Sequence, residues 1–473
     1  MNEETTRDIT EMNEEIKEAT VAEEAEETAE EITEEAIEET LVETEEPAPQ
    51  SEPPEEVPIM PLSRVNRFFL AALFPLIFIL IFGVILLVTG REDDGGTEAP
   101  TEEPYYEVKA DEVRGVYVAS VYNINYPSSS TLSAAQLKAE LDGIIVTCAE
   151  NGLNAVYLQV SPMSDALYDS DILPTSSVLT GTEGALLPEG FDPLEYLCDK
   201  AHKAGIAVHA WVNPMRVTAG GHDPEDLSAD NPATDNSLTV TYGGEVYYNL
   251  GLPEVRGLQA RVCAELAREY PVDGILFDDY FYPYPVGDEV FDDSAAYAEY
   301  GGAYDSVEDF RRASTTALVS ECYDAVKAVR ADCQFGVAPF GIWRNDDGRN
   351  GGSATGGMES YETLYCDSLA FIRAGKVDYI APQLYWTFGS KAAPYAELCD
   401  WWTEAVEDTD VRLLISHAAY QAGTWGDSSE YAEQVEYART KRPYYGSIYY
   451  GYAAINGNEA GIADAFAKIY KEK

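Results

Sequence analysis

From Val113 onward, short apolar runs rich in β-branched and aromatic residues alternate with segments of helical period. Such alternation is typical of a parallel sheet with crossover helices. The runs predict strands at Gly115–Ser120, Ala155–Val160, Ala207–Trp211, Gly274–Phe277, Phe335–Ala338, Tyr379–Pro382, Leu413–Ser416 and Ser447–Tyr450. The intervening segments predict helices near Ala134–Glu150, Leu194–Ala204, Glu254–Tyr270, Ser306–Arg330, Tyr361–Ala374, Tyr395–Glu407, Ser429–Thr440 and Asn458–Tyr470.

Eight strand–helix pairs across residues 111–473 predict an α/β fold, a (β/α)8 TIM barrel. A doubly wound open sheet is the alternative, but no GxGxxG follows the first strand. The connections after the second, third and fourth strands are long, at residues 161–192, 212–253 and 278–305. Those that enter the following strands are short. Long loops therefore gather at the C-terminal face, where barrels build their functional sites.

The fourth strand carries the most informative motif, VDGILFDDYFYPYP at residues 272–285. A buried apolar run ends there in Asp278 and Asp279, and ring side chains beginning with Tyr280 follow at once. The C-terminal end of a barrel strand is where catalytic groups lie. An isolated pair of aspartates more often caps a loop or pairs with an arginine. The surrounding pattern favours a catalytic interpretation here.

Other strand ends carry aromatic rings interleaved with amide, imidazole and guanidinium groups. Rings stack on the apolar faces of sugars while polar groups bind the hydroxyls, so we expect a carbohydrate site. The expected substrate-binding residues are Arg114, Gln159, His209, Trp211, Asn213, Arg216, Tyr280, Trp343, Arg344, Gln383, Tyr385, Trp386 and His417. Any single tyrosine taken alone is more often core or rim packing, and it is the repetition at eight strand ends that favours a binding role.

Several long motifs resemble the glycosyl hydrolase-like 10 family of bacterial envelope proteins. They are RGVYVASVYNINYPS (114–128), LNAVYLQVSPMSDALY (153–168), FDPLEY (191–196), AHKAGIAVHAWVNPMRV (201–217), VDGILFDDYFYPYP, FGVAPFGIWRN (335–345) and VDYIAPQLYW (377–386). The resemblance covers residues 111 to about 402. It implies a TIM-barrel glycosidase that acts on bacterial cell-wall glycan of the peptidoglycan type.

The fourth strand departs from the chitinase-type DGxDxDxE signature, because Leu276 and Tyr280 stand where that signature has acids. A two-carboxylate mechanism fits better, in which one acid protonates the leaving oxygen and the other attacks carbon or activates water. Asp278 is our choice of nucleophile or base, and Asp279 is next to it. Asp165 ranks first as the second carboxylate, and it could instead brace its loop.

The alternatives for the second carboxylate are Glu183, Asp346 and Asp347. A different class of function also stays open: a glycan-binding barrel that tethers the membrane to the cell wall without hydrolysis.

Charge is unevenly distributed along the chain. Residues 1–62 hold 23 of the 85 acids, against two bases and no aromatic residue. Such a segment cannot bury enough apolar surface to order itself, so we expect a disordered tail, with a solvated helix as the alternative. A third hypothesis makes this tail the functional end, recruiting a cytoplasmic partner.

Residues 68–90 form a charge-free run of 23 residues, FFLAALFPLIFILIFGVILLVTG. This length spans a hydrocarbon core of about 30 Å. Arg64 and Arg67 precede the run and acids follow it, so the positive-inside rule puts the N-terminus in the cytoplasm. We therefore expect a single-pass membrane protein with a linker at residues 91–110 and an extracellular barrel.

Composition argues against several partners. Residues 63–473 carry 62 acids against 28 bases, a net charge of −34 that disfavours nucleic acid. The seven scattered cysteines read as buried packing thiols rather than a disulfide framework. Neither they nor the four histidines have zinc-ligand spacing, so we expect no metal and no cofactor.

Overall fold

The computed structural model describes residues 112–220, 224–278, 281–349 and 351–471. The acidic tail (1–62), the expected span (68–90) and the linker (91–110) lie outside this part. Within it, no helix is both long and apolar enough to cross a membrane.

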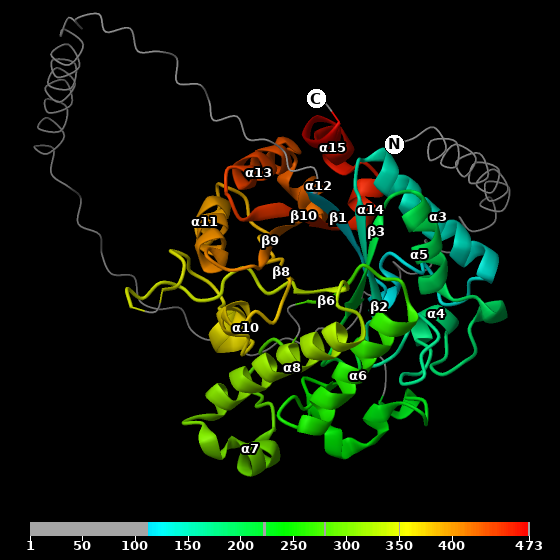
Figure 1. Cartoon of the computed structure of the whole chain (residues 1–473), viewed down its shortest axis with the longest axis vertical. Coiled ribbons are helices and arrows are strands. Elements are labelled where there is room, and N and C mark those ends of the chain that lie inside the picture. The colour runs from blue at the N-terminus through cyan, green and yellow to red at the C-terminus, as the bar shows by residue number, and fades with distance from the viewer. Residues whose placement is uncertain (1–111, 221–223, 279–280, 350, 472–473) are drawn as a thin grey trace, which may run out of the picture. The chain divides into compact units, whose positions relative to one another are not determined.

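Eight parallel strands close into a barrel, in the order β1-β2-β3-β6-β7-β8-β9-β10 and back to β1 (Figure 1). Their bounds are β1 Val113–Val118, β2 Ala155–Ser161, β3 Ala207–Val212, β6 Gly274–Phe277, β7 Gln334–Val337, β8 Tyr379–Ile380, β9 Arg412–His417 and β10 Tyr444–Tyr450. All eight predicted strands are present. The closed order of neighbours confirms the TIM barrel and excludes the open sheet.

Helices surround the barrel, and most begin and end within a residue or two of the predicted ones (Figure 1). The main helices are α3 Ala134–Glu150, α5 Pro193–Lys203, α6 Pro253–Glu269, α8 Val307–Val329, α10 Ser368–Arg373, α11 Tyr395–Val406, α13 Ser429–Arg439 and α15 Ile462–Tyr470. Shorter ones are α4 Ser177–Thr180, α7 Ser294–Tyr300, α9 Ser360–Thr363, α12 Ala422–Trp425 and α14 Tyr452–Asn456.

One predicted helix, 361–374, is broken into α9 and α10. Tyr365 between them has a φ of 49°, which a helix does not allow. Asp367 then caps α10 by accepting the N–H of Ala370. The apolar period of the segment is continuous, so the pattern alone did not reveal the break.

The long connection after β3 contains a hairpin that the sequence pattern left as loop. β4 (Thr239–Tyr242) and β5 (Glu245–Tyr248) pair antiparallel across Gly243 and Gly244, whose φ values are 60° and 81°. Glycine tolerates such positive values in a two-residue turn. β5 in turn pairs with the segment that leaves β3, through Arg216 and Tyr247. The hairpin is thereby fixed beside the C-terminal end of the barrel.

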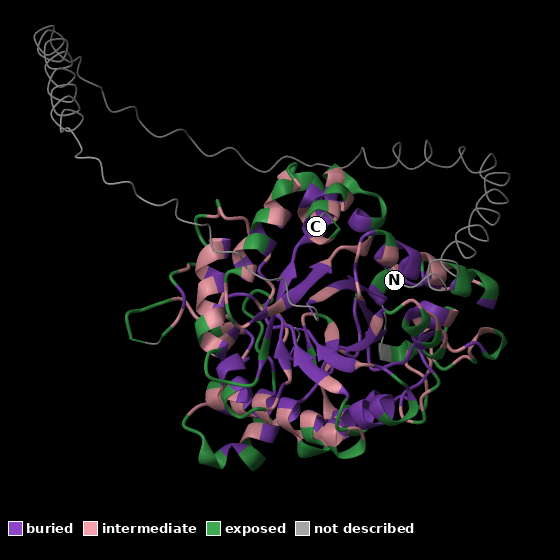
Figure 2. Cartoon of the chain, turned by 45° about the horizontal axis from the view of Figure 1, so that its top comes forward, coloured by how far each residue is buried: buried purple, intermediate pink, exposed green. Residues whose placement is uncertain are grey.

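Buried residues form two clusters, a large one shared by strands and helices and a smaller one of mostly strand residues inside the barrel. Figure 2 accordingly colours most of the barrel strands as buried. The interior holds large rings next to glycines. The imidazole of His209 stacks on Tyr157 with 4.5 Å between centroids. A Cβ at Gly274 would come within 2.5 Å of that imidazole, so only glycine fits there. All seven cysteines are buried thiols, as predicted.

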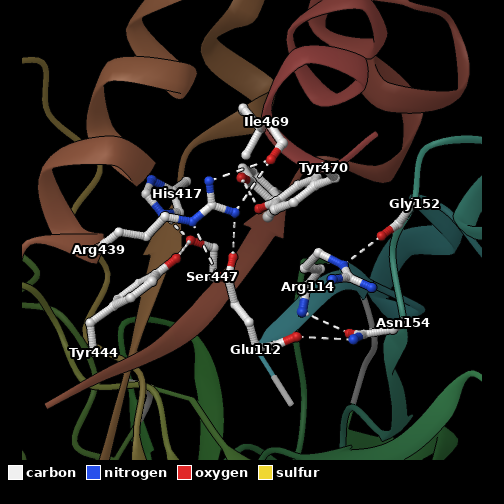
Figure 3. Close-up of polar contacts among 11 residues, drawn as sticks. Glu112, Arg114, Gly152, Asn154, His417, Arg439, Tyr444, Ser447, Ile469 and Tyr470 are labelled. Atoms are coloured by element: carbon white, nitrogen blue, oxygen red, sulfur yellow. Dashed lines mark hydrogen bonds and ion pairs between the residues drawn. The ribbon is translucent and has the colours of Figure 1, made fainter. Parts of the chain in front are cut away.

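Polar contacts fasten the N-terminal end of the barrel (Figure 3). Glu112, directly before β1, forms an ion pair of 2.8 Å with Arg439 at the end of α13, and the two side chains are 3% and 13% exposed. Arg439 also donates to the carbonyl of Ile469 in α15. The first strand is thus tied to the last helices of the fold, at the end opposite the long loops.

Candidate active site

Asp278 directly follows β6 and is only 5% exposed. Its Oδ2 accepts hydrogen bonds from Nδ2 of Asn213 at 2.6 Å and from the indole Nε1 of Trp211 at 3.1 Å. Both donors come from the end of the neighbouring strand β3. N–H donors stabilise the ionised form of a carboxylic acid. The geometry therefore favours a charged carboxylate at this position.

The carboxylate of Asp278 lines a pocket of about 260 Å³ at the C-terminal end of the barrel. The pocket joins groups from β1, β2, β3, β6, β10 and the β4–β5 hairpin. Its lining residues are Val121, Tyr122, Ile124, Gln159, Trp211, Arg216, Thr218, Ala219, Glu245, Tyr247, Asp278 and Tyr450. Gln159, Trp211, Arg216 and Asp278 thus lie together, as the strand-end argument requires.

Aromatic rings form a continuous wall on one side of the pocket. Trp211 meets Tyr450 edge to face with 6.5 Å between centroids. Tyr450 then stacks on Tyr385 at 6.1 Å and 14° between planes. Tyr420, 45% exposed, contacts both of these tyrosines. Flat apolar surfaces next to a buried carboxylate are suited to sugar rings.

Glu245, the first residue of β5, is a second carboxylate in the pocket lining. Its Oε1 accepts the N–H of Gly220 at 2.6 Å, and its Oε2 lies 2.6 Å from the hydroxyl of Thr218. Sequence reasoning missed this residue because it treated 212–253 as loop. The signal was present in TVTYGGEVYY, two β-rich runs around Gly-Gly, which predicts a hairpin.

The structure does not bring the expected second carboxylates to this pocket. Asp165 is 1% exposed and its Oδ1 accepts the N–H of Met163, so it braces its own loop. Glu183 accepts hydrogen bonds from the 228–231 segment. Asp346 and Asp347 are exposed and accept backbone N–H groups two residues ahead. The contacts of Asp165, Asp346 and Asp347 lie within their own loops, and that of Glu183 joins two loops. None of the four lines the pocket.

The two expected histidines are packed inside the fold rather than at the pocket. His209 lies in the barrel interior, where its Nδ1 is 3.0 Å from the hydroxyl of Tyr379. His417 is the last residue of β9, and its ring nitrogens lie 2.8 Å from Ser447 (Figure 3) and from Gln434 of α13. Burial lowers the pKa of each imidazole from 6.5 to about 4. Both are neutral core residues, and we reassign them from substrate binding to packing.

Arg114 lies at the wrong end of the barrel for a substrate contact. It is the second residue of β1, and its Nε donates to the carbonyl of Gly152 at 2.7 Å (Figure 3). Its guanidinium also lies over the ring of Tyr470. Function in a TIM barrel is concentrated at the opposite, C-terminal end. Arg114 therefore stabilises the N-terminal end.

The remaining predicted groups surround the mouth without lining the pocket. Trp343 stacks on Trp401 of α11, and Arg344 pairs with Glu362 of α9 at 2.7 Å. Gln383 donates to the carbonyl of Ala338, and Trp386 packs edge to face on Phe340. Tyr385 contacts Tyr450 and Tyr420 but does not itself line the pocket. Asp279 and Tyr280 lie outside the described residues.

A larger hollow of about 1200 Å³ lies outside the barrel, between the 161–192 loop, α5 and α6. Its lining is acidic, and two of the acids, Asp192 and Glu265, hold the loop in place. Asp192 accepts from the hydroxyl of Tyr270, and Glu265 accepts from Ser170 and from the N–H of Asp171. These contacts hold the long loop against the helices.

In the described part of the chain, no group of three or more His, Cys, Asp or Glu side chains could hold a metal ion.

Comparisons with known proteins identify the family of this chain. Residues 112–432 match the family described as Glycosyl hydrolase-like 10. The glycosyl hydrolase YngK of Bacillus subtilis (strain 168) is 37% identical over 364 residues, which cover 75% of this chain and 71% of that protein. The glycosyl hydrolase DigH of Escherichia coli (strain K12) is 35% identical over 328 residues, or 66% and 74% of the two chains.

Among solved structures, the PgaB (BpsB) glycoside hydrolase domain from Bordetella bronchiseptica covers 76% of this chain and 99% of its own. Its TM-score is 0.49 and its sequence identity is 15%. At that level the likeness adds nothing to the barrel topology already described.

Proposed function

Because the chain belongs to the glycosyl hydrolase-like 10 family, we propose that its barrel cuts O-glycosidic bonds of bacterial cell-wall glycan, with Asp278 and Glu245 as the carboxylate pair. Most glycosidases use two carboxyl groups that flank the scissile bond. One is ionised and acts as nucleophile or base, and the other carries the proton that is given to the leaving oxygen. In this proposal Asp278 is the nucleophile or base and Glu245 is the acid.

The observation that carries the proposal is the position of Asp278. A buried carboxylate at a strand's C-terminal end opens into a pocket whose wall is aromatic. Burying a charge is costly unless donors compensate, and Asp278 has two. A purely structural aspartate would not need access to a pocket. A sugar bound against Trp211 and Tyr450 would lie next to it.

Glu245 replaces Asp165 as the proposed second carboxylate, because it is the other acid among the described residues that line the pocket. Its partner Thr218 accepts the N–H of Val246 and can also accept a proton-bearing Oε2 of Glu245. A hydroxyl serves as donor or acceptor. The site thus accommodates Glu245 in its protonated and its ionised form, as an acid catalyst requires.

We propose further that the substrate is glycan stripped of its acidic stem peptides. The net charge of −34 over residues 63–473 repels strongly anionic polymers. Within the described pocket lining, Arg216 is the sole cation facing two carboxylates. Stripped glycan keeps the lactyl carboxylate of every second sugar but loses the carboxylates of the stem peptides, so it meets that environment better than peptide-bearing wall.

The test is to incubate the purified full-length chain with stripped and with peptide-bearing peptidoglycan, with and without a chelator. We expect new reducing ends from the stripped glycan, at a rate that the chelator does not change. Faster cleavage of peptide-bearing wall would contradict the substrate proposal, and loss of the rate to the chelator would contradict a metal-free mechanism. Binding of both polymers without cleavage would favour the tethering alternative.

The membrane anchor is also a proposal. The charge-free run 68–90 and the arginines before it support one span with the N-terminus in the cytoplasm. The barrel would then act outside the cell, where cell-wall glycan lies.

A further inference from the structure

A chain of hydrogen bonds crosses four neighbouring strands of the barrel and ends on Asp278. It begins at the backbone N–H groups of Ser120 and Val121, after β1, which both donate to Oε1 of Gln159 on β2 at 2.9 Å. Nε2 of Gln159 donates to Oδ1 of Asn213, after β3, at 2.6 Å. Nδ2 of Asn213 donates to Oδ2 of Asp278, after β6, at 2.6 Å. The strands β1, β2, β3 and β6 are consecutive in the barrel.

The direction of this chain is fixed by chemistry. A backbone N–H only donates, so the amide oxygen of Gln159 must face Ser120 and Val121. Its NH2 group must then face Asn213, and the oxygen of Asn213 must face Gln159. The NH2 group of Asn213 is left to face Asp278. Neither amide can turn over without placing two donors or two acceptors against each other.

Burial strengthens the constraint. The exposed fractions of Gln159 and Asn213 are 1% and 2%, so water does not readily replace a lost partner. A mismatched buried amide loses its hydrogen bond and keeps its desolvation cost. The hydroxyl of Ser120 adds a bond of 2.8 Å to the carbonyl of Gln159, which holds the first step in place.

We propose, on the basis of the proposed function, that Gln159 and Asn213 are positioning residues that keep Asp278 ionised. The sequence analysis expected both residues to bind the sugar. In this proposal they act through Asp278 instead. Each group in this series of hydrogen bonds presents an N–H to the oxygen of the next. The last donor, the NH2 group of Asn213, therefore stabilises negative charge on Asp278. Asp278 then serves as the charged partner of the catalytic pair, and the proton comes from another group.

The informative variant is Gln159→Glu. A glutamate still accepts from Ser120 and Val121 but has no hydrogen to give to Asn213. The Asn213 amide is then driven to turn over, which points its oxygen at Asp278 and removes a donor from it. We expect the acidic limb of the kcat/KM profile, recorded from pH 3.5 to 8 on stripped glycan, to move up by about one pH unit or more.

Two further variants change the hydrogen bonds to Oδ2 of Asp278 without altering Gln159. Trp211→Phe removes the indole N–H but keeps a ring, and Asn213→Asp puts a second carboxylate against Asp278. Both should move the acidic limb upward, and Asn213→Asp should move it most because like charges repel. Gln421→Glu, which adds a charge at the mouth after β9 outside the chain of bonds, is the matched control. Its acidic limb should stay at the wild-type position.

A lower rate in these variants with an unchanged acidic limb would overturn the inference, since loss of packing alone does not move a titration. A wild-type protein that cleaves no glycan would instead count against the proposed function. The two failures are therefore distinguishable.

Discussion

Asp278 and Glu245 differ in the kind of group that contacts them. The Oδ2 of Asp278 accepts hydrogen bonds from the NH2 group of Asn213 and the indole N–H of Trp211, two groups that only donate. Glu245 accepts the N–H of Gly220 through Oε1, but its Oε2 contacts the hydroxyl of Thr218, which can donate or accept. This difference assigns the negative charge to Asp278 and the transferable proton to Glu245 in our proposal.

We predict that Glu245→Gln slows hydrolysis of stripped glycan by about 10²–10⁴-fold, the usual contribution of general acid catalysis. Glutamine keeps the acceptor for Gly220 and a partner for Thr218, so the hairpin should remain folded. A disaccharide with a 2,4-dinitrophenyl leaving group needs no proton, and its hydrolysis should stay within a few-fold of wild type. Reducing-end and absorbance assays measure the two rates.

Glu289→Gln is the control for that variant. Glu289 accepts the N–H of Gly243 on the same hairpin but is exposed and does not line the pocket. It should leave both rates unchanged. Equal losses on the two substrates in Glu245→Gln would show that Glu245 only shapes the hairpin.

Individual residues show which parts of the site could be predicted from the sequence. Asp278 could be predicted because it directly follows a short apolar strand. The C-terminal ends of all strands lie on the same face of a TIM barrel, so the position of such a residue is known in advance. His209 and His417 follow the same alternation, yet their side chains point into the interior and toward the helices. Which side of a strand faces a cavity depends on ring packing, such as Gly274 making room for His209.

At the scale of elements, His417 joins β9, β10 and α13 through bonds of 2.8 Å to Ser447 and Gln434. Its imidazole is neutral because burial lowers its pKa to about 4. In the unfolded chain the imidazole takes up a proton near pH 6.5. Between these values the unfolded state binds more protons, so the free energy of unfolding falls as the pH drops from 6.5 to 4.

We predict that His417→Gln reduces this loss of stability by up to about 3 kcal/mol, from a pKa difference of about 2.5 units at 1.36 kcal/mol each. Urea unfolding at pH 7 and pH 4.5 measures it in both proteins. The comparison uses the change with pH, because the variant also loses packing at every pH. An identical pH dependence in the two proteins would show that His417 is not the titrating group.

Helices and strands were largely predictable because their apolar periods are long and clear. The exceptions have local causes. The break between α9 and α10 depends on one residue with positive φ, Tyr365. The β4–β5 hairpin is a short insertion whose strands have four residues each, so it resembles loop. That insertion carries Glu245, and missing it meant missing half of the proposed catalytic pair.

At the scale of the whole molecule, the barrel is one part of a longer chain with an acidic segment and an apolar run before it. We predict that protease added to intact protoplasts removes the barrel while an epitope at the N-terminus persists. The reason is that Arg64 and Arg67 precede the run, which favours a cytoplasmic N-terminus. Immunoblots against both ends provide the measurement. Protection of the C-terminal epitope would reverse the topology.

The most direct test of the account compares the wild-type full-length chain with Asp278→Asn on stripped glycan. Asparagine has the same shape and can still bond to Asn213 and Trp211 through its oxygen, so the circular dichroism spectrum and melting temperature should hold. We predict that the wild type releases reducing ends and that the variant loses at least about two orders of magnitude in rate. Wild-type turnover by the variant, or a loss explained by unfolding, would contradict a catalytic Asp278.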